Sequence, residues 1–83
     1  MVTFTQRAED ALRASLAAAL RFDPHASLRV ERLEGGVRAV FVVERDPSDQ
    51  AVDLGGGLTV GVEPGLDGTI DAGEHNQLAV VGP

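Results

Sequence analysis

The sequence predicts an α+β fold in which one N-terminal helix packs on a mixed or antiparallel β-sheet. Two observations support this prediction. Before Pro24, apolar residues recur at a spacing of four, which is typical of one face of a helix. After Pro24 they alternate with polar residues, which is the pattern of a half-buried strand. A single helix followed by strands indicates a helix that covers one face of a sheet.

The helix is expected at about residues 6–21. Thr5 is a suitable N-cap, because its hydroxyl can accept a hydrogen bond from a free amide of the first turn. Thr3 with Gln6 offers an alternative start, a capping box. Pro24 prevents the helix from continuing. The apolar face is expected to pack on the sheet through Leu12, Leu16 and Leu20.

Four later segments are rich in β-branched or aromatic residues and are expected to form strands. They are residues 28–33, 37–44, 58–62 and 78–81. Glu34-Gly35-Gly36 separates the first two as a turn, because glycine adopts positive φ angles without steric cost. Those two strands are therefore predicted to form a hairpin. Asp46-Pro47-Ser48-Asp49 and Gly55-Gly56-Gly57 are further expected breaks.

The 83 residues are expected to form a single domain, residues 1–83. Residues 1–45 contain all seven arginines and six acids, whereas residues 46–83 contain seven acids and no basic side chain except His75. This acidic half argues against nucleic acid as a partner, because phosphate binding needs clustered bases. It is interpreted as a solvated surface, with a docking face for a basic partner as the alternative.

The chain has no cysteine, and its apolar runs are too short to span a bilayer. Its first residues do not resemble a signal peptide. We therefore expect a cytoplasmic protein that does not bind membranes.

Asp71, Glu74 and His75 are the candidate metal ligands, because carboxylates and an imidazole can share a metal ion. Their spacing matches no zinc pattern, and histidines such as His25 and His75 are more often surface residues. No nucleophile lies in a catalytic context, so no catalytic residue is assigned and no enzyme activity is expected.

The segment from Glu63 to Glu74 has part of the spacing of an EF-hand calcium loop, with Gly68 at the sixth position. Gly65 stands at the third position, where a side-chain oxygen is needed. The preceding residues 58–62 alternate like a strand, whereas an EF-hand has helices on both sides. Calcium binding is therefore not expected.

Several short motifs occur in the same order as in a known protein family. They are Thr5-Gln6-Arg7-Ala8, Leu28-Arg29-Val30, Gly35-Gly36-Val37, and the segment with Leu66, Gly68, Ile70 and Asp71. In this order, from Phe4 to Pro83, the chain resembles the A-type iron–sulfur carriers (HesB/IscA-like proteins). The last segment has one residue fewer between glycine and isoleucine than the carriers have. The resemblance implies a HesB-like core.

In the carriers, a cysteine follows the paired glycines and two more lie in a Cys-Gly-Cys tail. Here Val37 stands at the first position, and the given chain ends at Pro83 without such a tail. The resemblance therefore implies a non-catalytic, carrier-like scaffold that cannot ligate a cluster through cysteine. Such a protein would be an adaptor or regulator that binds an iron–sulfur assembly protein. The alternative is a small-ligand or metal-binding protein that reuses the scaffold.

The carriers form homodimers or larger assemblies, so the resemblance also implies a homodimer. The acids of residues 46–83 would repel one another across a symmetric contact. We therefore expect the interface in the first half of the chain, around residues 28–33 and 37–44.

No cofactor is expected, and the iron–sulfur case can be tested directly. Iron–sulfur clusters are held mainly by cysteine thiolates, and this chain has none. After anaerobic reconstitution with iron and sulfide, the purified protein is expected to show no visible absorption band of a cluster. A stable cluster in stoichiometric amount would contradict this expectation.

Overall fold

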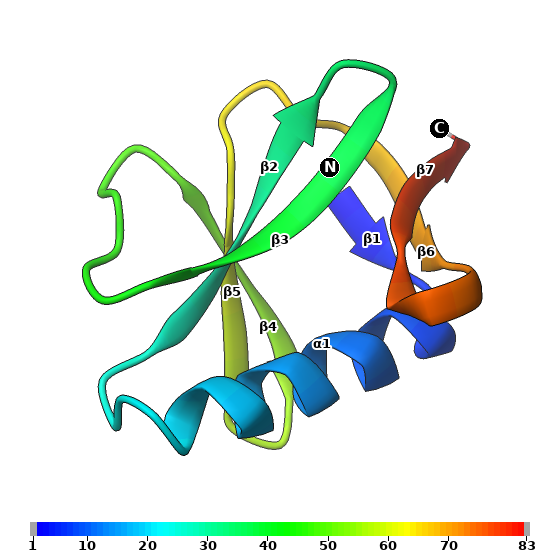
Figure 1. Cartoon of the computed structure of the whole chain (residues 1–83). Coiled ribbons are helices and arrows are strands. Elements are labelled where there is room, and N and C mark those ends of the chain that lie inside the picture. Colours follow the sequence, from blue (N-terminus) through cyan, green and yellow to red (C-terminus); the bar gives the residue numbers. More distant parts are fainter. Residues whose placement is uncertain (1, 83) are drawn as a thin grey trace.

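The computed structural model describes residues 2–82. Met1 and Pro83 lie outside the described residues, so the last residue of the segment that resembles the carriers is not described. The expected α+β class with an N-terminal helix is confirmed (Figure 1). In chain order the elements are β1 (Val2–Phe4), α1 (Gln6–Leu20), β2 (Ser27–Leu33), β3 (Gly36–Val42), β4 (Gln50–Gly55), β5 (Leu58–Val62), β6 (Gly68–Ala72), the 3-10 turn η1 (Glu74–Asn76) and β7 (Leu78–Gly82).

The strands form two sheets rather than the single sheet expected from the sequence. The larger sheet has the order β3-β2-β5-β4, and the smaller has the order β1-β6-β7. The hairpins β2–β3 and β4–β5 are antiparallel, and a parallel pairing of β2 with β5 joins them. In the smaller sheet, β1 is parallel to β6 and β6 is antiparallel to β7. Both sheets are therefore mixed.

The four expected strands are present, but some of their ends differ. β3 ends at Val42, so the prediction that Val43 and Glu44 continue the strand was wrong. The sequence interpretation also missed β1, β4 and β6. β1 is only three residues long. β6 contains Gly68 and Asp71, two residue types that are depleted in strands, and its pairing with both β1 and β7 holds it extended.

The helix begins where the sequence predicted. Thr5 is the N-cap, and its Oγ1 accepts a hydrogen bond from the amide of Ala8 at 3.2 Å. The amide of Thr5 itself donates to the carbonyl oxygen of Ile70 at 2.9 Å. The helix start is therefore tied both to its own first turn and to β6.

The face that α1 buries differs from the predicted stripe. Leu12 is buried and Leu16 packs partly buried against the core, but Leu20 is 43% exposed. A spacing of four advances about 40° around the helix axis at each step, so Leu20 lies about 120° from Ala8. Ala19, which returns to within about 20° of Ala8, is buried instead. The prediction for Leu20 was therefore wrong.

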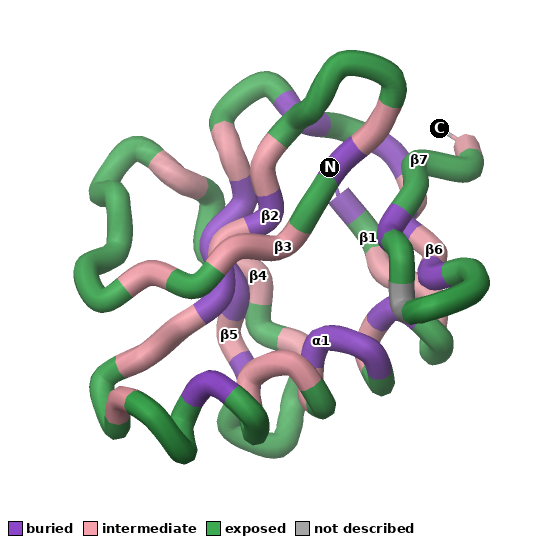
Figure 2. Tube along the Cα trace, in the orientation of Figure 1, coloured by how far each residue is buried: buried purple, intermediate pink, exposed green. Residues whose placement is uncertain are grey.

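The core lies between the two sheets and α1. Figure 2 shows buried positions on α1 and on the strands that face it. Val30, Val60 and Val62 are completely buried and lie on the paired strands β2 and β5. The helix contacts β6, β2, β1 and β3, so it covers both sheets.

The burial pattern predicts different costs for leucines on the same helix. Leu12→Ala is expected to lower the free energy of unfolding by about 2–5 kcal/mol, because it leaves a cavity in the core. Leu20→Ala is expected to cost about 0.5 kcal/mol or less, and Leu16→Ala an intermediate amount. Urea unfolding followed by circular dichroism measures all three. Equal costs for Leu12→Ala and Leu20→Ala would contradict the helix orientation.

Candidate functional site

The turn between β2 and β3 lies beside β7 and forms the first candidate site. β7 packs against β3 without joining its sheet. Two clefts of about 320 Å³ each open between these segments. Both are lined by Leu33, Gly35, Gly36, Val37 and Ala79. We call these two the corner clefts.

The turn geometry explains the paired glycines. Gly35 has a φ of 83°, a left-handed conformation that glycine adopts without steric cost, and Gly36 pairs with Leu33 to close the hairpin. Val37 follows and is only 4% exposed. Val37 is thus a core side chain at the base of the corner clefts.

Polar groups border the corner clefts on both sides. Glu34, Glu74 and Gln77 line one cleft, and Arg32 and Asp67 line the other. The rim is also apolar, because Leu33 is 40% exposed and Val80 on β7 is 42% exposed. The corner clefts therefore offer an open surface of mixed polarity.

The first predicted metal ligand, Asp71, is hydrogen-bonded within the fold. It lies on β6, and its Oδ1 accepts from Thr5 Oγ1 at 2.6 Å and from the amide of Ala72 at 2.9 Å. The Thr5 hydroxyl, followed by the Ala72 amide, lowers the pKa of Asp71 below its ordinary value. Asp71 thus fixes the start of α1 to β6, a role that its sequence neighbours do not indicate.

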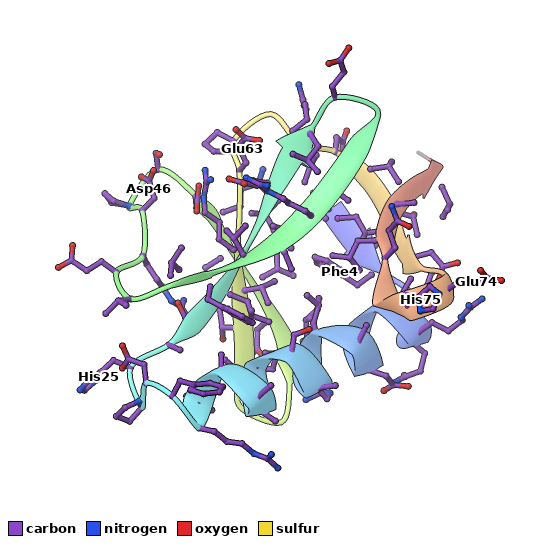
Figure 3. The ribbon with its side chains drawn as sticks, in the orientation of Figure 1. Phe4, His25, Asp46, Glu63, Glu74 and His75 are labelled. Atoms are coloured by element: carbon purple, nitrogen blue, oxygen red, sulfur yellow. The ribbon has the colours of Figure 1, made fainter. Side chains whose placement is uncertain are left out.

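The other two predicted ligands are exposed residues of the loop between β6 and β7. Glu74 and His75 lie in η1 at the end of the molecule (Figure 3). His75 has a φ of 57°, so η1 is a kinked turn rather than a regular helix. Within residues 2–82, no three Asp, Glu or His side chains are placed to hold one metal ion, so Asp71, Glu74 and His75 are not brought together as a site.

The remaining residues considered from the sequence are Glu63, in the segment compared with an EF-hand, and His25. The Glu63 carboxylate accepts a hydrogen bond from the amide of Arg32 at 2.7 Å, which fixes the loop after β5 to the end of β2. A strand precedes this loop, as the sequence indicated, and β6, which the sequence interpretation missed, follows it. His25 is exposed in the turn after α1, far from His75 in Figure 3.

An ion-pair network crosses the larger sheet. Arg29 donates to both carboxylate oxygens of Asp49, at 2.7 and 3.1 Å, and to Glu31 at 3.0 Å. Arg38 donates to the other oxygen of Glu31 at 2.6 Å. The hydrogen bonds that Arg29 donates to Asp49, and then the negative charge of Asp49, raise the pKa of Arg29 above its ordinary value. The network ties the loop before β4 to the sheet.

Gly61 makes room for this network. It pairs with Arg29 across the β2–β5 ladder. A Cβ atom at Gly61 would lie 3.1 Å from Asp49 Oδ2, which is closer than ordinary van der Waals contact. The missing side chain therefore lets the Asp49 carboxylate lie over β5 and reach Arg29, and the geometry assigns this network a structural role.

A second candidate surface lies at the far end of β3. A groove of about 300 Å³ is lined mainly by apolar side chains. Its most exposed members are Phe22 at 90%, Phe41 at 60% and Val43 at 64%. We call these three residues the end patch. The strand pattern would place Phe41 in the core with Val37, and only the position of the helix end reveals that it is exposed.

The comparisons with known proteins leave the family undetermined. No protein-family model, no curated protein and no solved structure matches the chain. Within residues 2–82, no helix is long and apolar enough to cross a membrane.

The contact between Thr5 and Asp71 predicts a pH-dependent contribution to stability. Since the pKa of Asp71 is lowered in the folded state, its charged form stabilises the fold above about pH 4, the ordinary range of aspartate. This contribution is lost as the pH falls through the lower folded-state pKa. Asp71→Asn is therefore expected to destabilise the protein at pH 7 and progressively less below pH 4. Urea unfolding at several pH values measures the difference.

Thr5 variants supply the matched control. Thr5→Ala removes both hydrogen bonds of the hydroxyl and is expected to cost about 1 kcal/mol through the lost helix cap. Thr5→Ser keeps the hydroxyl and is expected to be close to the unmodified protein. An Asp71→Asn effect of the same size at every pH would contradict the proposed role of the carboxylate.

Proposed function

We propose that this chain is a non-catalytic adaptor or regulator in iron–sulfur cluster assembly, built on a scaffold like that of the A-type carriers. The observation that carries the proposal is the position of Val37 beside β7. In the carriers, one ligand position follows the paired glycines and the others lie near the C-terminus. Here Val37, which follows the paired glycines, lies beside the C-terminal strand β7 at the corner clefts. The proposal includes the cytoplasmic location expected from the sequence.

The corner clefts favour a protein as the partner. A small-molecule site usually encloses most of its ligand. Here, by contrast, the clefts open on both sides of the turn, and their rim exposes Leu33 and Val80 next to charged side chains. Apolar residues bordered by polar ones are typical of a protein-binding surface. Val37 offers no atom that binds iron, so the proposed role is contact with an assembly protein.

A pull-down with a corner variant tests this function. The tagged chain is expected to recover iron–sulfur assembly proteins, identified by mass spectrometry. Leu33→Asp is expected to reduce that recovery about tenfold, because it places a charge on the apolar rim. The matched control is Ala51→Glu, an added charge at an exposed position on β4, at the other edge of the larger sheet.

Two results would contradict the proposal. The first is that the unmodified chain recovers no assembly protein. The second is that Leu33→Asp and Ala51→Glu recover the same amounts as the unmodified chain, which would place the contact elsewhere. Circular dichroism of each variant verifies that it is folded.

A further inference from the structure

The loop that leads into β6 contains the only aspartate of the chain that is followed by glycine, Asp67-Gly68. Of the other six aspartates, two precede proline and four precede a residue with an ordinary side chain. Proline has no amide hydrogen, and a side chain hinders approach to the amide nitrogen of its own residue. Asp67 is therefore the one aspartate whose carboxyl group can approach the next amide without hindrance from a side chain.

The fold requires a glycine at this position. Gly68 has a φ of 114°, a conformation that residues with a side chain rarely adopt. A Cβ atom at Gly68 would lie 2.6 Å from the carbonyl oxygen of Gly82 and 3.1 Å from Val80 Cγ1, because β7 passes closely over it. A side chain that would shield the Gly68 amide therefore does not fit between β6 and β7.

The Asp67 carboxyl group lies against that unshielded amide. The amide nitrogen of Gly68 donates a hydrogen bond to Asp67 Oδ1 at 3.0 Å. Oδ1 is bonded to Cγ, which is the carbon that this nitrogen attacks when an aspartate cyclises. Groups held about 3–3.5 Å apart react faster than groups that first have to meet. Asp67 is also exposed, so water has access to the carboxyl group.

We propose that Asp67 is a site of spontaneous modification, at which the link to Gly68 isomerises from the main-chain carboxyl to the side-chain carboxyl group. The Gly68 nitrogen forms a bond to Asp67 Cγ, and the carboxylic hydroxyl group leaves with the amide proton as one water molecule. The product is a cyclic imide. Water then adds to its main-chain carbonyl, and cleavage of the original C–N bond leaves isoaspartate. The water that leaves is balanced by the water that adds, so no other reactant is needed.

Isoaspartate at this position changes the main chain between two buried residues. Leu66 and Gly68 are both buried, one on each side of Asp67. Gly68 is also the first residue of β6 and pairs with Val2 of β1. The isoaspartate link runs through Cβ and adds one atom to the main chain, so either Leu66 or the start of β6 has to move. The modified chain is therefore expected to unfold at a lower urea concentration than the unmodified chain.

The same modification changes one of the corner clefts. Asp67 and Leu66 line the cleft that also contains Arg32. Isomerisation leaves the free carboxylate on Cα instead of at the end of the side chain, so the negative charge moves relative to Arg32. A lower recovery of assembly proteins by the modified chain is expected, and this consequence rests on the proposed function. The isomerisation itself does not.

Incubation of the purified, folded chain at physiological temperature and mildly acidic pH tests the site. Proteolysis and mass spectrometry with electron-transfer fragmentation distinguish the two linkages and locate them. Isoaspartate is expected to form at Asp67 at least as fast as in a synthetic peptide of residues 64–70, because the fold holds the reacting groups together. Asp71 is the control within the chain and is expected to stay unmodified. Its Oδ1 also accepts from the next amide, at 2.9 Å, but that amide belongs to Ala72, which has a side chain.

Two variants test the chemistry of the step. Asp67→Glu keeps the charge but would have to close a larger ring, so it is expected to abolish the modification at this position. Asp67→Asn forms the same imide by losing ammonia instead of water. It is expected to react severalfold faster, because a carboxamide carries no negative charge that repels the attacking nitrogen. The incubated Asp67→Glu chain is also the control for urea unfolding, and its midpoint is expected to stay unchanged.

The outcomes separate this proposal from the proposed function. Much slower modification of Asp67 in the folded chain than in the peptide would overturn the proposal, because the fold would then protect the bond. Equal modification of Asp67 and Asp71 would also overturn it, because the missing side chain of Gly68 would then have no effect. Neither result bears on the adaptor role, whose test is the recovery of assembly proteins by freshly purified chain and by Leu33→Asp. Conversely, a fresh chain that recovers no assembly protein would leave the measured isomerisation unchanged.

Discussion

The parallel pairing of β2 with β5 is the interaction on which the rest of the structure depends. It joins two hairpins that are separate in the sequence, and it places Val30 beside Val62 in a fully buried position. The same pairing places Gly61 next to Arg29, where the Asp49 carboxylate can lie over β5. Parallel neighbours need a connection that crosses from one end to the other. The packing of the core therefore has to hold together segments about thirty residues apart.

The first strand, β1, is fixed by a similar long-range pairing. β1 lies parallel to β6, and the N-cap threonine that begins α1 also donates to a carboxylate on β6. The helix is thus tied to the smaller sheet at its start, and it packs on strands of both sheets. In a domain this small, where burial is limited, such shared contacts let one helix complete the core of both sheets.

Both candidate surfaces arise from the position of β3 at the edge of its sheet. Beside the start of β3, β7 lies alongside without joining its sheet, and the corner clefts open between them. Beside the end of β3, the helix α1 has already terminated. Phe41 is therefore exposed, although its partner Leu28 on β2 is buried. One strand therefore carries a mixed polar and apolar surface at one end and an aromatic surface at the other.

Local features were determined by the sequence itself, because they depend on neighbouring residues. The Thr5 cap, the glycine turn before Val37 and the alternation in β2 and β5 each follow from side chains a few positions apart.

Long-range features were decided only by the tertiary structure. Helix geometry moves Leu20 away from the face of Ala8, but the tertiary structure decided which helix face is buried, and that face includes Ala19. Likewise, nothing near Asp71 in the chain indicates that its partner is Thr5, because the two meet only through the β1–β6 pairing. The absence of thiol chemistry is a property of composition, whereas the exposure of Phe22 and Phe41 depends on how helix and strand end in space.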